Sequence, residues 1–175
     1  MPTTPRLLTL PNLLSLARFP LAAAFVLVQG TGARVALLSA AALTDLLDGW
    51  LARRGQTTQL GALLDPVADK TFVLVAISAF LFDGTIGTTD YFIVLSRDFA
   101  IAIGFFVAYV TPGLDAGKFK ARWSGKVVTA LQLLALLLLL LRPSLFPMLL
   151  PAIAIASAWA IADYTIALHR TRVRS

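Results

Sequence analysis

The chain has 175 residues, of which 58% are hydrophobic, and its mean hydropathy is +0.83. This composition is too apolar for an ordinary soluble domain and predicts an all-α polytopic membrane protein, with six transmembrane helices in a single domain spanning residues 1–175. The net charge of +6 comes from basic residues that flank the apolar segments, which favours lipid headgroups over nucleic acid as a partner. The absence of cysteine excludes disulfides and thiol chemistry.

Six apolar segments, separated by short polar or glycine-containing stretches, are the predicted spans. They cover approximately residues 11–29, 33–54, 60–82, 91–110, 126–141 and 146–168. If the amino terminus is cytoplasmic, one side of the membrane carries most of the basic residues: Arg6, Arg18, Arg53, Arg54, Lys70, Lys118, Lys120, Arg122, Lys126, Arg170, Arg172 and Arg174. The other side carries only Arg34 and Arg142. This bias predicts that both termini face the cytoplasm.

Two pairs of aspartates lie where the second predicted span ends and the third begins. Asp45 and Asp48 are three residues apart, and Asp65 and Asp69 are four apart, so each pair shares one face of a helix. Four converging carboxylates repel one another unless a cation lies among them. Mg²⁺ is commonly held by a few carboxylates together with substrate phosphates. The stretch therefore predicts a metal site on the cytoplasmic side.

Small residues and an arginine follow the first aspartate pair. Gly49 and Ala52 continue its helical face with almost no side chain, which lets a ligand approach the backbone closely. Arg53 adds a fixed cation one turn past Gly49, suited to a phosphate. An alternative interpretation, a capped helix pair with solvated aspartates, does not explain why the aspartates interrupt such apolar segments.

The pattern Asp45-x-x-Asp48-Gly49-x-x-Ala52-Arg53, followed by Gly61-x-x-x-Asp65-x-x-x-Asp69, resembles the signature of the CDP-alcohol phosphotransferase family. The resemblance implies a membrane enzyme that transfers a phosphatidyl group from CDP-diacylglycerol to a hydroxyl acceptor and releases CMP. It implies Mg²⁺ or Mn²⁺, with two ions, as cofactor, and a homodimer as the assembly. It also implies a bacterial inner-membrane location with the active site facing the cytoplasm.

The resemblance assigns roles to the residues of the motif. The expected metal ligands are Asp45, Asp48, Asp65 and Asp69. Asp69 is also the expected catalytic base that takes the proton of the acceptor hydroxyl. The residues expected to bind the CDP-lipid are Asp48, Gly49, Ala52, Arg53 and Gly61.

Other polar residues in or beside predicted spans are further candidates. Arg97 and Asp98 lie within the fourth span, where ionisable groups are costly and are functional candidates by default. We expect Arg97, Arg122 and Lys126 to bind an acceptor phosphate. The alternatives are a structural pair for Arg97, binding of lipid headgroups for Arg122 and an ordinary interfacial anchor for Lys126. Arg18 could reach the headgroups or face the polar site, and the sequence favours neither. The roles of Asp98 and Asp163 stay open.

The resemblance narrowly favours glycerol-3-phosphate as the acceptor alcohol over phosphatidylglycerol, the acceptor of a cardiolipin synthase. Asp163-Tyr164 and the segment GKVVTALQ fit the enzymes that use glycerol-3-phosphate, whereas Ser96-Arg97-Asp98 is closer to the cardiolipin synthases. The segment Asp65 to Lys70 is similar to the form found in both kinds of enzyme. A cation transporter that uses the four aspartates is an alternative from another functional class, but it leaves Gly49, Ala52 and Arg53 unexplained.

Overall fold

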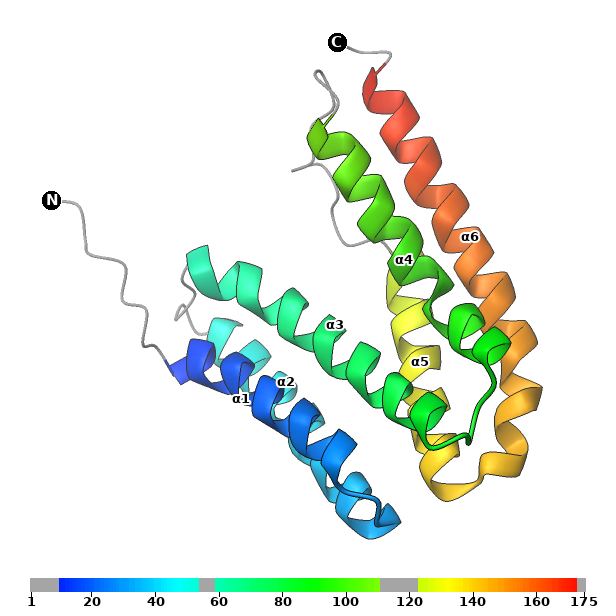
Figure 1. Cartoon of the computed structure of the whole chain (residues 1–175). Coiled ribbons are helices and arrows are strands. Elements are labelled where there is room, and N and C mark those ends of the chain that lie inside the picture. The colour runs from blue at the N-terminus through cyan, green and yellow to red at the C-terminus, as the bar shows by residue number, and fades with distance from the viewer. Residues whose placement is uncertain (1–9, 54–58, 111–122, 173–175) are drawn as a thin grey trace, which may run out of the picture. The chain divides into compact units, whose positions relative to one another are not determined.

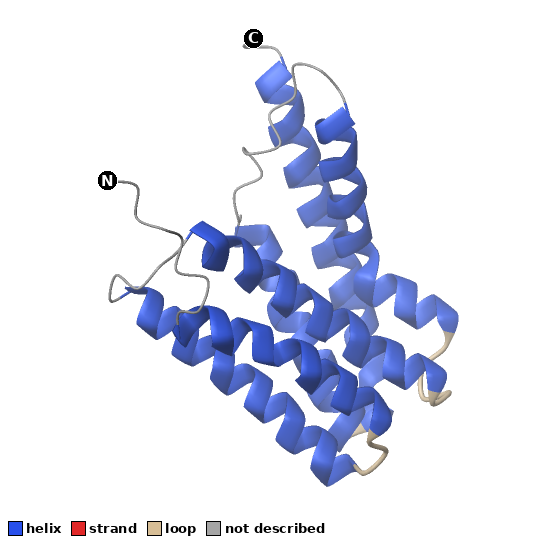
Figure 2. Cartoon of the chain, turned by 60° about the vertical axis from the view of Figure 1, so that its left-hand side comes forward, coloured by secondary structure: helices blue, strands red, loops and turns tan. Residues whose placement is uncertain are grey.

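The structure, a computed structural model, describes residues 10–53, 59–110 and 123–172. Within these ranges it is helical throughout apart from short connections, and it contains no strand. The described helices are α1 (Leu10–Leu27), α2 (Thr31–Arg53), α3 (Gln59–Phe82), α4 (Thr88–Val110), α5 (Trp123–Leu141), the 3₁₀ turn η2 (Pro143–Leu145) and α6 (Phe146–Arg172) (Figures 1 and 2). These bounds confirm the predicted all-α class and the six predicted helical segments to within a few residues.

Two of the described helical segments are long and apolar enough to cross a membrane by length and composition alone. They are Trp123–Leu141, which is α5, and Pro143–Ile166, which includes most of α6. A shorter apolar stretch covers Asn12–Leu27 in α1. The helices α1 to α4 carry the ionisable residues of the polar clusters described below, so their apolar runs are interrupted.

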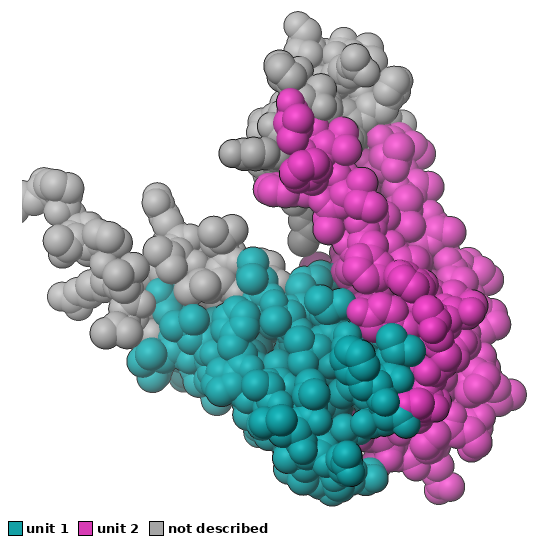
Figure 3. Space-filling model, in the orientation of Figure 1, with its two compact units in different colours: residues 1–83 teal, residues 84–175 magenta. Residues whose placement is uncertain are grey.

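The chain divides into two compact units, Met1–Asp83 and Gly84–Ser175 (Figure 3). Gly84, the first residue after the division, has φ +70°, the left-handed conformation that commonly ends a helix and that glycine adopts without strain. The next helix, α4, begins with the Gly87 amide donating to Asp90 Oδ2 at 3.1 Å. This contact satisfies one amide of the helix start with an acidic group that the helix dipole favours.

In the first unit, α1 packs against both α2 and α3. Its core centres on Phe25, which is fully buried and makes edge-to-face contacts with Phe72 and Phe80, with ring centroids 6.0 and 5.9 Å apart. The small residues Ala22 and Ala76 are also buried in this unit.

A buried arginine joins the ends of these three helices. Arg34, near the start of α2, donates through Nε to the carbonyls of Phe25 and Val28 at the end of α1, at 3.2 and 2.6 Å. Its Nη1 atom pairs with Asp83, which directly follows α3, and its guanidinium lies over the rings of Phe25 and Phe80. Arg34 therefore satisfies carbonyls that a helix end leaves without partners.

In the second unit, α6 packs against both α4 and α5. The buried apolar residues of this unit include Leu95 of α4, Val128 and Leu136 of α5, and Ile153 and Ala160 of α6. Val128 and Ala160 belong to one core cluster, against which Leu131 packs. Polar residues interrupt this apolar packing on α4 and α5, and they form the second cluster of interest.

Candidate active site

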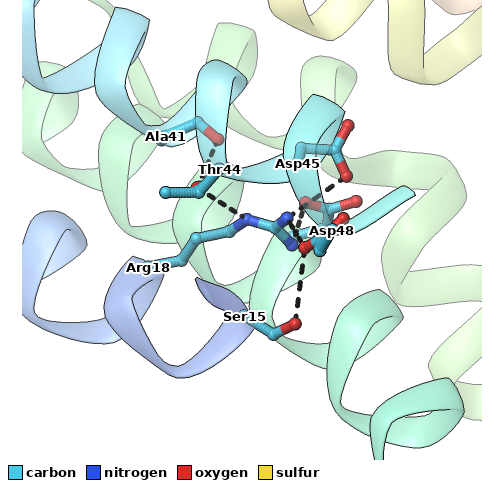
Figure 4. Close-up of polar contacts among 7 residues, drawn as sticks. Ser15, Arg18, Ala41, Thr44, Asp45 and Asp48 are labelled. Carbon is cyan, nitrogen blue, oxygen red and sulfur yellow. Dashed lines mark hydrogen bonds and ion pairs between the residues drawn. The ribbon is translucent and has the colours of Figure 1, made fainter. Parts of the chain in front are cut away.

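Arg18 is at the centre of the polar cluster of the first unit. Its side chain is 1% exposed and extends from α1 to the face of α2 that carries Asp45 and Asp48 (Figure 4). Nη2 donates to Asp45 Oδ1 at 3.3 Å and makes a closer contact with Asp48 Oδ2. Nε donates to Thr44 Oγ1 at 3.3 Å. The structure thus decides between the two roles that the sequence left open, because Arg18 faces the aspartates.

A third aspartate meets the same guanidinium from α3. Asp69 Oδ1 lies 2.9 Å from Arg18 Nη1, within ion-pair distance although the geometry is not that of a hydrogen bond. We call Arg18, Asp45, Asp48 and Asp69 the aspartate cluster. The structure brings together three of the four aspartates that the sequence predicted as metal ligands.

The three carboxylates differ in how far they are enclosed. The Asp48 side chain is 4% exposed and also accepts a hydrogen bond from Ser15 Oγ at 3.4 Å, whereas Asp45 and Asp69 are 53% and 48% exposed. The i, i+3 spacing places Asp45 and Asp48 on one face of α2, as the sequence predicted, and that face meets Arg18 of α1. A molecule from outside can therefore reach Asp45 and Asp69, but not Asp48 without a rearrangement.

The donor chemistry of the aspartate cluster fits a hard divalent cation, because carboxylate oxygens are the ligands that Mg²⁺ prefers. In the part of the chain that the structure describes, however, no three such side chains are positioned to share one ion. The guanidinium of Arg18 lies among the carboxylates and contacts each of them. A metal ion bound at these residues would therefore lie close to the positive charge of Arg18.

A second polar cluster lies among α4, α5 and α6. The Arg97 side chain is buried, and Nη1 donates to Asp98 Oδ1 at 2.9 Å. Asp98 Oδ2 in turn accepts from Gln132 Nε2 of α5, which also donates to the Val94 carbonyl at 2.9 Å. The Arg97 guanidinium lies over the Tyr164 ring, 5.7 Å from its centroid. Asp98 therefore fixes the position of the Arg97 guanidinium by a hydrogen bond, and Gln132 fixes the Asp98 carboxylate in the same way.

Gly125 makes room for this arrangement, a role that the sequence analysis did not assign. A Cβ atom at this position would lie 2.9 Å from Tyr164 Oη and 3.3 Å from Arg97 Cζ, and closer still to Arg97 Nη2. No sequence signal pointed to this role, because Gly125 directly precedes the predicted span 126–141 and lies between the polar residues Ser124 and Lys126.

The neighbours of Gly125 have separate contacts. Ser124 Oγ donates to Asp163 Oδ2 at 2.8 Å, which gives Asp163 a structural partner on α5. Lys126 is exposed, and its Nζ lies 5.4 Å from the centroid of the Trp123 ring. Lys126 is thus open to an anionic ligand, while Asp163 is part of the packing between α5 and α6.

Several residues predicted from the sequence lie outside what the structure describes. Arg122 belongs to an undescribed segment, and the side chains of the following residues are not described: Gly49, Ala52, Arg53, Gly61 and Asp65. Their predicted roles stay predictions.

Comparison with known proteins identifies the family. Residues 8–164 match the family described as CDP-alcohol phosphatidyltransferase. The chain belongs to this family. The match spans both polar clusters and both units, and it confirms the resemblance seen in the aspartate motif.

Individual members of the CDP-alcohol phosphatidyltransferase family are similar to much of the chain. A CDP-diacylglycerol–glycerol-3-phosphate 3-phosphatidyltransferase of Escherichia coli is 38% identical over 148 residues, which cover 78% of this chain and 79% of the relative. The corresponding Aquifex aeolicus protein is 37% identical over 103 residues, 55% of this chain and 58% of the relative. A CMP-forming cardiolipin synthase of Rattus norvegicus is 33% identical over 144 residues, 72% of this chain and 48% of the relative. The chain therefore spans only about half the length of the last two relatives.

Proposed function

We propose that the protein is a phospholipid-synthesising transferase that moves a phosphatidyl group from CDP-diacylglycerol to glycerol-3-phosphate and releases CMP. The observation that carries the proposal is the aspartate cluster, in which three carboxylates of the family motif contact one buried guanidinium. Two relatives named for glycerol-3-phosphate as acceptor support this choice of acceptor. Family membership also favours a transferase over the alternative of a cation transporter.

We propose Asp45, Asp48, Asp65 and Asp69 as the residues that hold Mg²⁺ or Mn²⁺, with two ions bound. When bound, the ions supply charge neutralisation at the pyrophosphate. Asp48, Arg53 and Gly61 contact the CDP-lipid, while Gly49 and Ala52 leave space for the cytidine. Arg53 suits a phosphate because its planar fork of donors can bind two oxygens at once.

In the proposed reaction, the acceptor hydroxyl oxygen forms a bond to the phosphatidyl phosphorus. The bond from that phosphorus to CMP breaks, and CMP leaves with the electron pair. Asp69 accepts the hydroxyl proton, and its half-exposed side chain supports this role because a substrate can reach it. Arg97, Arg122 and Lys126 bind the acceptor phosphate. The exposed ammonium of Lys126 is consistent with such contact.

We also propose that residues 1–175 form one enzyme domain of six spans, with both termini cytoplasmic, in a bacterial inner membrane and as a homodimer. The asymmetry of lysine and arginine supports the orientation. Epitope tags at each terminus and protease access in sealed cells test it, and tags on opposite sides would contradict it.

Purified protein in detergent, supplied with CDP-diacylglycerol and Mg²⁺, tests the reaction and the acceptor together. We expect CMP release with glycerol-3-phosphate and none with phosphatidylglycerol. Asp48→Asn is the control, because it removes an enclosed carboxylate while keeping its size. Release with phosphatidylglycerol alone would make the protein a cardiolipin synthase, which the rat relative makes the second candidate. No release with either acceptor would refute the proposal.

A further inference from the structure

The aspartate cluster contains its own cation. The Arg18 guanidinium, buried to 1% exposure, is within 3.3 Å of a carboxylate oxygen on each of Asp45, Asp48 and Asp69. Removing such a guanidinium from water is costly unless its partners compensate for the lost hydration. The carboxylates supply that compensation, and in return the arginine relieves their mutual repulsion.

The net charge of these four side chains indicates which kind of ligand the cluster can bind. Three carboxylates and one guanidinium sum to −2, because 1 − 3 = −2. This excess negative charge favours divalent cations, but any cation bound at these carboxylates would lie close to the positive charge of Arg18. The most enclosed carboxylate, Asp48, makes the closest contact with Arg18. Arg18 and a metal ion thus compete for the negative charge of the same carboxylates.

We propose that Arg18 is a positioning residue that acts as the resident counter-ion of the aspartate cluster. It holds Asp45, Asp48 and Asp69 together before metal binds, and its charge weakens divalent-cation binding at the same carboxylates. This inference rests on the metal site of the proposed function. It assigns Arg18 two effects of opposite sign, since removing it destabilises the metal-free protein and tightens metal binding.

The test compares wild type with Arg18→Gln, which removes the charge, and Arg18→Lys, which keeps it. Free Mn²⁺ is measured by electron paramagnetic resonance, and unfolding is followed by the fluorescence of Trp50, Trp123 and Trp159, with no substrate present. We expect Arg18→Gln to bind Mn²⁺ about tenfold more tightly, equal to about 1.4 kcal/mol, because a neighbouring positive charge is removed. Its metal-free unfolding temperature should fall, and saturating Mn²⁺ should restore it. Arg18→Lys should bind Mn²⁺ as wild type does.

Arg34→Gln is a matched control. Arg34 is also buried in the first unit and paired with an aspartate, but it lies fourteen positions from Asp48 on α2, about 21 Å along the helix axis. The Arg34→Gln substitution should lower the unfolding temperature of the protein without changing its affinity for Mn²⁺. An increase in affinity in this control would show that general loosening, not the Arg18 charge, tightens binding, and would overturn the inference.

The other possible outcomes of the Mn²⁺ experiment also test the inference. Unchanged or weaker Mn²⁺ binding by Arg18→Gln would overturn the inference while leaving the proposed metal site intact. Failure of Arg18→Gln to fold even with excess Mn²⁺ would do the same, because a metal could then not replace the guanidinium. Absence of Mn²⁺ binding by wild type and variant alike would refute the proposed metal site itself. Binding by Arg18→Gln alone would support the competition.

Discussion

Substitution of Gly125 by alanine should disturb acceptor binding more than any other step. The new methyl group would lie 2.9 Å from Tyr164 Oη and overlap the Arg97 guanidinium, and contacts this short must be relieved by movement. The guanidinium is at the end of the long Arg97 side chain and can move away. It then loses its hydrogen bond to Asp98 and its contact with the face of the Tyr164 ring. Overpacking of this kind costs about 1–3 kcal/mol of stability.

The functional effect follows from the displaced charge. A hydrogen bond to a charged group contributes about 1.5–3 kcal/mol, and each 1.4 kcal/mol corresponds to a factor of ten. If Arg97 binds the acceptor phosphate, Gly125→Ala should therefore raise the KM for glycerol-3-phosphate about 10- to 100-fold. The KM for CDP-diacylglycerol should stay near that of wild type. Steady-state CMP release, with each substrate varied in turn, measures both constants.

A matched control is Gly32→Ala, which makes the same change in α2, where a Cβ atom would meet nothing within 4 Å. It should leave both KM values unchanged. An unchanged KM for glycerol-3-phosphate in a well-folded Gly125→Ala protein would refute the assignment of Arg97 to the acceptor. An equal rise in both KM values would show that the effect is on the fold.

Three further substitutions test other parts of the reasoning. Asp69→Asn should lower turnover by about 10²–10⁴-fold in a CMP-release assay, and rescue by excess Mg²⁺ would show that Asp69 acts as a ligand and not as the base. Arg53→Lys should weaken CDP-diacylglycerol binding, because lysine cannot reproduce the fork of donors; unchanged affinity in a direct binding measurement would exclude this role. Arg34→Gln should cost about 3 kcal/mol in denaturant unfolding, the lower end for a broken buried pair because Asp83 is partly exposed. A double-mutant cycle with Asp83→Asn that shows no coupling would contradict this origin.

The helices were predictable because their apolar runs are long and end at glycine, proline or charged residues. The structure begins α4 at Thr88, three residues before the predicted start at Tyr91, because Gly87 and Asp90 provide an N-terminal cap within a stretch that appeared to be a turn. It was also predictable that Asp45 and Asp48 lie on the same face of α2, since helical spacing fixes which residues share a face.

The partners of buried charges could not be predicted in the same way. Periodicity placed Arg18 inside the first span but could not decide between solvent and site, because that depends on which face of α1 meets α2. Gly125 lies against Arg97, and Gln132 donates to Asp98, and these partners are far away in sequence. No local sequence pattern can therefore predict the roles of Gly125 and Gln132. Such contacts become visible only when the helices are packed.

The pair of Arg34 and Asp83 has a consequence for the energetics of the protein in an energised membrane. In the proposed orientation both charges lie on the outer side, and moving one unpaired positive charge across the whole membrane potential changes its free energy by about 2.3 kcal/mol per 100 mV. Because the two charges cancel, the potential exerts little net force on this end of the first unit. Asp83→Asn would leave one uncompensated charge, so any movement of this end of the first unit across the membrane would become dependent on voltage.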